Sequence, residues 1–173
     1  MTEPQAPDPS WPRYTTTPFP PYRFVPGRHP HPRNSPLGHS YGRPEPQLAA
    51  FPPEGWRQAE GYLYGIDLYN YAYWWECHEV FESLWQAVGP KTEQGNFFQA
   101  LIQLAAANLK HFVGDLQAAG NLMDRGLIRL EKAPGFYMGV DVRGLSEDVR
   151  RYGIGPAKRP VLIRLDGSIG PPA

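Results

Sequence analysis

Proline is distributed very unevenly along this 173-residue chain, and its distribution limits where helices can form. Fifteen of the twenty-one prolines fall within residues 1–53, whereas residues 54–133 contain only Pro90. Proline lacks a backbone N–H and its ring clashes with the preceding helical turn, so long helices are confined to the interval that almost lacks it. The sequence therefore predicts a helical core flanked by two extended ends.

The same reasoning divides the chain into four segments. Residues 1–15 are expected to be disordered, because this polar and proline-rich stretch cannot bury enough apolar surface to offset the entropy of ordering. Residues 16–53 contain aromatic residues as well as prolines, which favours an extended strap laid over the core instead of a free linker. The helical domain is expected at residues 54–153, and an extended C-terminal tail at residues 154–173.

Helix caps and helix breakers divide the core into about five helices. They are expected at about residues 55–70, 72–88, 93–113, 116–132 and 147–152, with Thr92, Asp115 and Ser146 as N-caps. Apolar residues cover nearly the whole circumference of the third helix, which is typical of a buried central helix. The predicted fold is thus all-α: a compact helical bundle with a central buried helix, wrapped by the proline-rich N-terminal strap.

Composition excludes several classes of partner. Lysine plus arginine and aspartate plus glutamate each number 17, so the net charge is zero, and no basic stripe for nucleic acid is visible. No apolar run reaches the roughly 18 residues that a membrane-spanning helix needs. Cys77 is the only cysteine, which rules out an intrachain disulfide, and the N-terminus lacks the features of a signal peptide. A cytoplasmic protein without nucleic-acid or membrane partners is expected.

The stretch WWECHEVFESLW at residues 74–85 is the most distinctive motif. On a helical wheel, one apolar stripe is expected to face the core: Trp74, Cys77, Phe81, Leu84 and Val88. A second line borders that stripe: Trp75, His78, Glu82 and Trp85. The remaining arc is expected to face solvent: Glu76, Glu79, Ser83 and Gln86.

His78 and Glu82 lie one helical turn apart, so their side chains can interact. A carboxylate beside an imidazole suits a general base, a group that supports a metal ligand, or a purely structural hydrogen bond. Gln99 and Gln103 of the next helix are expected to face this pair. The candidate ligand-binding site is therefore made of five residues: His78, Glu82, Trp85, Gln99 and Gln103.

The strap supplies a candidate metal site. If the strap crosses the bundle near residue 78, its three histidines converge there on a site for a divalent metal ion or an anion. The candidate ligands are His29, His31, His39, His78 and Glu82. The alternative is that the strap histidines only bind the strap to helix ends, and their spacing matches no metal-binding motif. HEVFE in particular is not the zinc-protease signature, because Glu82 stands where that signature has a second histidine.

The run WWECHEVFESLW followed by FFQALIQLAAANLKH resembles the bacterial and archaeal domain of unknown function 309 family. Eight residues match its pattern: His78, Glu79, Glu82, Trp85, Gln103, Ala105, Ala106 and His111. Ala100 falls where many relatives carry glycine, and the strap is similar to the N-terminal segment of the longer members. The resemblance spans about residues 18–145 and implies an all-α bundle with a central helix, but no established activity.

Two function hypotheses remain open, and whether the protein is an enzyme stays undecided. In the first, the His78 site binds a metal ion or a small polar ligand. In the second, the same residues form a structural hydrogen-bond network in a scaffold that binds a second chain or forms a homo-oligomer through exposed aromatic residues: Trp56, Tyr62 and Tyr69. A hydrolase is a weaker third hypothesis, in which His78 is the base that activates water and Glu82 orients the His78 imidazole.

Overall fold

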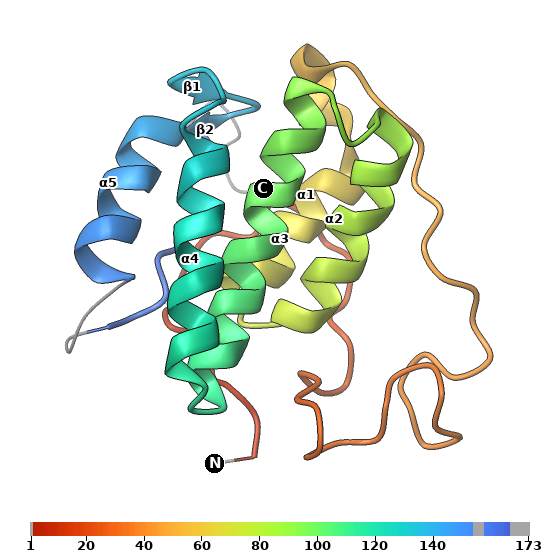
Figure 1. Ribbon diagram of the computed structural model, residues 1–173. Coiled ribbons are helices and arrows are strands. Elements are labelled where there is room, and N and C mark those ends of the chain that lie inside the picture. Colours follow the sequence, from red (N-terminus) through yellow and green to blue (C-terminus); the bar gives the residue numbers. More distant parts are fainter. Residues whose placement is uncertain (1, 154–157, 167–173) are drawn as a thin grey trace.

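A computed structural model describes residues 2–153 and 158–166, which form five α-helices (Figure 1). Four of them lie in the interval that is poor in proline, and the fifth follows Pro134. The five helices are α1 (Glu60–Asn70), α2 (Trp74–Val88), α3 (Glu93–Phe112), α4 (Leu116–Leu130) and α5 (Val142–Tyr152). A 3-10 helix, η1 (Pro53–Gln58), precedes them, and the short antiparallel strands β1 (Phe136–Tyr137) and β2 (Val140–Asp141) lie between α4 and α5. The predicted all-α bundle is confirmed.

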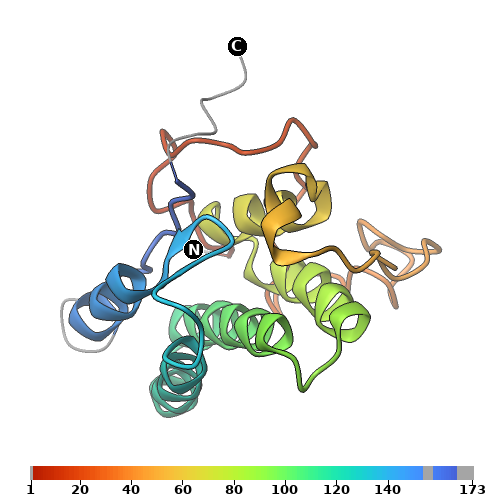
Figure 2. The same cartoon turned by 90° about the horizontal axis from the view of Figure 1, so that it is seen from above.

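Helix α3 is the central helix of the bundle, with α2 packed on one side and α4 on the other (Figures 1 and 2). Its apolar residues are buried around nearly the whole circumference, as the sequence predicts. Phe98 of α3 stacks on Phe81 of α2, with ring centroids 6.1 Å apart. On the other side, a Cβ at Gly126 would lie 2.9 Å from the side chain of Leu104, so this glycine lets α4 approach α3 closely.

Two of the three predicted helix caps are confirmed. The Thr92 hydroxyl accepts a hydrogen bond from the Gly95 N–H, and the Asp115 carboxylate accepts one from the Ala118 N–H. The prediction of Ser146 as a cap is wrong, because α5 begins four residues earlier, where Asp141 accepts a hydrogen bond from the Gly144 N–H. Ser146 lies inside that helix and its hydroxyl donates to the carbonyl oxygen of Val142.

The first predicted helix is split in two. Ala59 has φ −84° and ψ 82°, which is not helical, and it separates η1 from α1. The three aromatic residues predicted to be exposed on this part of the chain are instead buried in the core: Trp56, Tyr62 and Tyr69. They therefore cannot form the exposed surface for a second chain that the scaffold hypothesis assigned to them.

The N-terminal residues are held on the helices, in contrast to the expected disorder of residues 1–15. The buried carboxylate of Asp67 in α1 accepts hydrogen bonds from the backbone N–H groups of Tyr14 and Thr15, at 2.8 and 2.9 Å. The Trp11 indole N–H donates to the carbonyl oxygen of Ile163 in the C-terminal segment. An acceptor buried in α1 thus supplies the order that local composition does not predict.

The strap, residues 16–53, runs in an extended course along the outer side of α2 (orange in Figure 1). Its Phe24 and Val25 are buried, as its aromatic content indicates. The C-terminal residues 158–166 are also extended, and Leu165 forms an isolated β-bridge with Val140 of β2. The rest of the predicted C-terminal tail, residues 154–157 and 167–173, lies outside the described residues.

None of the helices formed by the described residues combines the length and the apolar character needed to cross a lipid bilayer.

Candidate functional site

The arc of α2 that the sequence predicts to face solvent lies largely beneath the strap. Glu76 is only 5% exposed, and its Oε1 accepts a hydrogen bond from the Phe24 N–H at 2.9 Å. One and two turns further along the helix, Glu79 and Ser83 also bind strap residues. The prediction of a solvent-facing arc is therefore wrong for these three residues, because periodicity alone does not reveal that a distant segment covers them.

Glu79 forms a bidentate ion pair with Arg33 of the strap. The Arg33 Nε and Nη2 donate to the two carboxylate oxygens at 2.8 and 3.0 Å, and both side chains are mostly buried. The hydrogen bond to Glu79 raises the pKa of the Arg33 guanidinium, which stays charged. Its Nη1 also donates to the carbonyl oxygens of Arg43 and Pro44, so that one guanidinium holds two parts of the strap against α2.

Next to this pair, His39 of the strap connects a serine with a buried carboxylate. Its Nε2 lies 3.0 Å from Oε1 of Glu76, and its Nδ1 lies 2.8 Å from the Oγ of Ser40. The imidazole is only 3% exposed, and it packs against the ring of Tyr22 at 4.7 Å. Because a carboxylate accepts but does not donate, the neutral imidazole in this geometry carries its proton on Nε2, and Nδ1 then accepts from the Ser40 hydroxyl.

These side chains line a cavity of about 440 Å³ between the strap and helices α1 and α2, which we call the strap cavity. Its apolar wall includes Phe19 of the strap and Tyr64 of α1, where burial raises the pKa of the tyrosine hydroxyl to about 12. Besides Thr17, its polar residues are Arg33, His39, Ser40, Arg43, Glu76 and Glu79.

Two polar groups of the strap cavity have no partner among the described residues. The Oε2 of Glu76 is buried and accepts no hydrogen bond there. The guanidinium of Arg43 is on the exposed part of the strap and makes no ion pair or hydrogen bond with the described part of the chain. The hydrogen-bonding capacity of this site is therefore incompletely used by the protein itself.

The predicted contact between His78 and Glu82 is present in α2. The His78 Nε2 lies 3.6 Å from the Glu82 Oε2, and the two side chains are 39% and 44% exposed. Glu82 also borders a small cavity of about 140 Å³, together with Glu45 of the strap and Glu79. Cys77 lies in the core as predicted, and burial raises the pKa of its thiol.

The glutamines of the predicted site lie on the neighbouring helix without bonding to this pair. The stacking of Phe81 on Phe98 places Gln103 of α3 at about the level of His78 along the helix pair. Gln103 is buried, and its Oε1 has no hydrogen-bond partner among the described residues. Gln99 is half-buried, as is Trp85. A ligand site formed by His78, Glu82, Trp85, Gln99 and Gln103 stays a prediction.

The structure does not bring together the predicted metal ligands His29, His31, His39, His78 and Glu82. Within residues 2–153 and 158–166, no group of three or more histidine, cysteine, aspartate or glutamate side chains is placed to hold a metal ion. The Nδ1 of His29 accepts from the Val25 N–H, and the Nδ1 of His31 accepts from the Arg33 N–H. These two rings therefore stabilise turns within the strap, whereas the alternative hypothesis has the strap histidines bind the strap to helix ends.

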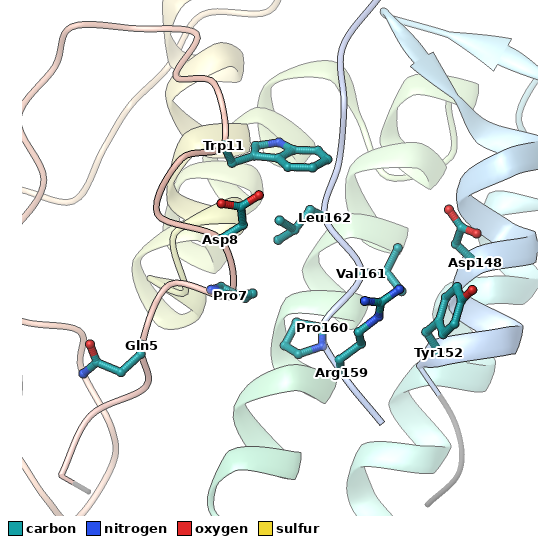
Figure 3. A pocket seen from close by; sticks show the side chains of 10 residues that line it. All are labelled: Gln5, Pro7, Asp8, Trp11, Asp148, Tyr152, Arg159, Pro160, Val161 and Leu162. Carbon is teal, nitrogen blue, oxygen red and sulfur yellow. The ribbon is translucent and has the colours of Figure 1, made fainter. Parts of the chain in front are cut away.

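A second cavity, of about 530 Å³, lies between the N-terminal segment, the C-terminal segment and α5 (Figure 3). Trp11 and Tyr152 stand on opposite walls of it, and the Arg159 guanidinium lies 4.3 Å from the Tyr152 ring. Asp8 accepts hydrogen bonds from Ser10, and the indole N–H of Trp11 is bound to Ile163. Although this cavity has a larger volume than the strap cavity, fewer polar side chains line it.

Sequence reasoning missed Glu76, Glu79 and Ser40 as members of a site. One signal was available for the glutamates: Glu76, Glu79 and Ser83 form a polar stripe at helical spacing, and the strap supplies Arg33 and His39 as partners of matching chemistry. No local pattern, however, indicates which of the polar stripes of α2 the strap covers.

Comparison with known proteins gives one match. Residues 62–122, which extend from α1 through α2 and α3 into α4, match the family described as Domain of unknown function (DUF309). No curated protein and no solved structure matches the chain. The matched region contains the α2–α3 pair with His78, Glu79 and Glu82, whereas the strap with His39 and Arg33 precedes it. By this match, residues 62–122 of the helical core are similar to the DUF309 family.

Proposed function

We propose that the strap cavity binds a small organic carboxylate. The observation that carries this proposal is the convergence on one cavity of an unpaired guanidinium, Arg43, and a hydroxyl, Ser40, that is bonded to an imidazole. A guanidinium offers paired N–H donors that fit a carboxylate. The Ser40 hydroxyl has one proton, which it can donate to the ligand in place of Nδ1 of His39. The apolar part of the ligand would then contact Phe19 and Tyr64.

One cation and the size of the cavity support a ligand of this class. Arg33 and Glu79 compensate each other in their ion pair, and Oε1 of Glu76 is bonded to His39 and the Phe24 N–H. Arg43 therefore remains as the cation available to a ligand in the described part of the cavity. A volume of about 440 Å³ lies within the range of roughly 300 to 1,000 Å³ that is usual for small-molecule sites.

Phenylacetate is a suitable probe, and benzyl alcohol is its uncharged control. We expect phenylacetate to bind and Arg43→Ala to weaken its binding about tenfold or more, because a charge-assisted hydrogen bond contributes about 1.5–3 kcal/mol. Benzyl alcohol should bind weakly to both proteins. Titration calorimetry or ligand-observed NMR measures the affinities, with Arg125→Ala on the exposed face of α4 as the control variant. Equal binding to wild type and Arg43→Ala would refute the proposal.

A structural role for the same residues is the second candidate, and one observation favours it. Three polar residues at helical spacing on α2 each bind the strap: Glu76 the Phe24 N–H, Glu79 the Arg33 guanidinium and Ser83 the Leu48 N–H. This network holds the strap to α2 at three points, and a purely structural network needs no ligand.

Under the structural hypothesis, Arg33→Ala should lower the free energy of unfolding by about 1–3 kcal/mol, because it leaves the mostly buried Glu79 carboxylate unpaired. Urea unfolding measures this loss, and limited proteolysis should show faster cleavage within the strap. Arg150→Ala is the matched control, since Arg150 pairs with Glu131 at an exposed position where an ion pair contributes roughly 0–1 kcal/mol. If the two variants lose the same stability, the network does not hold the strap.

A further inference from the structure

We infer that Ser40, His39 and Glu76 form a nucleophile, a general base and an orienting carboxylate, and that the strap cavity hydrolyses small carboxylic esters. This inference rests on the proposed function, because the acid released from such an ester is the carboxylate that the cavity is proposed to bind. It adds a reaction to the binding site and assigns a role to each of the three side chains.

The geometry meets the requirement for an activated serine. The Ser40 Oγ and the Glu76 Oε1 lie 2.8 and 3.0 Å from the two ring nitrogens of His39, within hydrogen-bond distance on both sides. A carboxylate that accepts from one nitrogen leaves the other free to take the proton of the hydroxyl. The serine is bonded here to Nδ1 and the carboxylate to Nε2, and the proton relay requires only that the two occupy different nitrogens.

The three groups are held in place by surrounding contacts. Glu76 and His39 are almost completely buried, and the Phe24 N–H donates to the same Glu76 oxygen that faces the imidazole. The backbone of Ser40 is fixed in a tight turn, because its N–H donates to the Pro32 carbonyl oxygen and its own carbonyl oxygen accepts from the Arg43 N–H. A catalytic group fixed in this way loses little entropy on reaching the reactive geometry.

Gly38 shows how closely the chain approaches itself in that turn. A Cβ at this position would lie 2.3 Å from the carbonyl oxygens of His31 and Pro32, so no other residue fits without a shift of the backbone. The turn that presents Ser40 and His39 to the cavity therefore depends on a glycine.

The reaction proceeds in two balanced steps. In the first, the Ser40 Oγ attacks the ester carbonyl carbon while Nδ1 of His39 takes the hydroxyl proton; the resulting imidazolium then donates that proton to the leaving alcohol as the C–O bond breaks. In the second, a water molecule attacks the acyl-serine and gives its proton to Nδ1, which returns it to the Ser40 oxygen as the acid is released. The guanidinium of Arg43 is available to stabilise the oxyanion that forms in each step.

Labelling by a fluorophosphonate probe tests the nucleophile directly. The Ser40 oxygen attacks phosphorus and fluoride leaves, which adds a defined mass that peptide mapping can place on Ser40. We expect wild type to be labelled, Ser40→Ala to be unlabelled, and His39→Gln to be labelled about 100-fold more slowly, because general base catalysis contributes about 10²–10⁴-fold. Ser35→Ala, in the same strap but outside the cavity lining, should be labelled like wild type.

Hydrolysis of methyl phenylacetate, whose acid product is phenylacetate, gives the second readout. Its rate should fall at least 100-fold in Ser40→Ala and more than tenfold in Glu76→Gln, which keeps the shape of the side chain and an oxygen that can accept from His39. Circular dichroism and the melting temperature show whether each variant is folded. Activity that persists in Ser40→Ala, or a wild type that is neither labelled nor active, overturns the inference.

The two proposals fail in distinguishable ways. Binding of phenylacetate without labelling of Ser40 refutes the esterase and leaves the carboxylate site. Labelling of Ser40 without measurable binding of phenylacetate supports the nucleophile and refutes the carboxylate as the ligand. Absence of both refutes the two proposals together and leaves the structural network.

Discussion

Replacement of Asp67 by alanine is expected to release the N-terminal segment from the helices and to lower the free energy of unfolding by about 3 kcal/mol. The Asp67 carboxylate is fully buried in α1 and accepts from the N–H groups of Tyr14 and Thr15, from the Thr15 hydroxyl and from Arg13. Alanine would leave two backbone N–H groups without acceptors, and a buried unsatisfied donor costs about 1–3 kcal/mol.

Urea unfolding measures this loss, and trypsin cleavage at Arg13 reports on the release of the segment. The control variant is Asp124→Ala, whose carboxylate is exposed on α4 and whose replacement should change the stability by less than about 0.5 kcal/mol. If Asp67→Ala unfolds like wild type and resists trypsin at Arg13, the segment is held by other contacts and the expected role of Asp67 is wrong.

Replacement of Phe98 by alanine should destabilise the bundle by about 3–5 kcal/mol. The side chain is fully buried in α3, and its ring lies 6.1–6.2 Å from the rings of four neighbours: Phe51, Tyr62, Phe81 and Phe97. Alanine would leave a cavity at the contact between the strap, α1, α2 and α3, and such a cavity adds to the lost burial of the ring.

Thermal and urea unfolding measure the effect, with Phe136→Ala as the control, because Phe136 is 56% exposed in β1. That control should lose less than about 1 kcal/mol. If both variants lose a similar free energy of unfolding, the burial of Phe98 at the centre of the bundle does not stabilise the fold more than an exposed ring does.

Local signals predict much of this fold. Thr92 and Asp115 cap α3 and α4 as expected, because a side-chain cap requires only the three residues that follow it. The contact between His78 and Glu82 also follows from helix geometry alone. Ser146 is not the cap, because Asp141, five residues earlier, also has a side-chain oxygen that can accept from a helix N–H. Asp141 lies where β2 ends, and α5 begins there.

The candidate site depends on pairs that are distant in sequence, and these were not predictable from periodicity. Glu76 falls on the polar arc of α2, and its burial follows only once His39 and Phe24, 37 and 52 residues earlier, are placed against it. The same holds for Tyr14 and Thr15, whose order depends on a carboxylate more than 50 residues away. Hydrophobic patterns identify the faces of a helix but not the segment that covers each face.

The two extended ends of the chain meet on α1, and this has a consequence for the time course of folding. The Tyr14 hydroxyl accepts from the Leu165 N–H across 151 residues, and Trp11 reaches Ile163 across 152. During synthesis on the ribosome, these hydrogen bonds of Tyr14 and Trp11 cannot form until Ile163 and Leu165 have emerged. The helical hairpin of α2 and α3 has no such delay, so the bundle should assemble first and the N-terminal segment should lock onto it last.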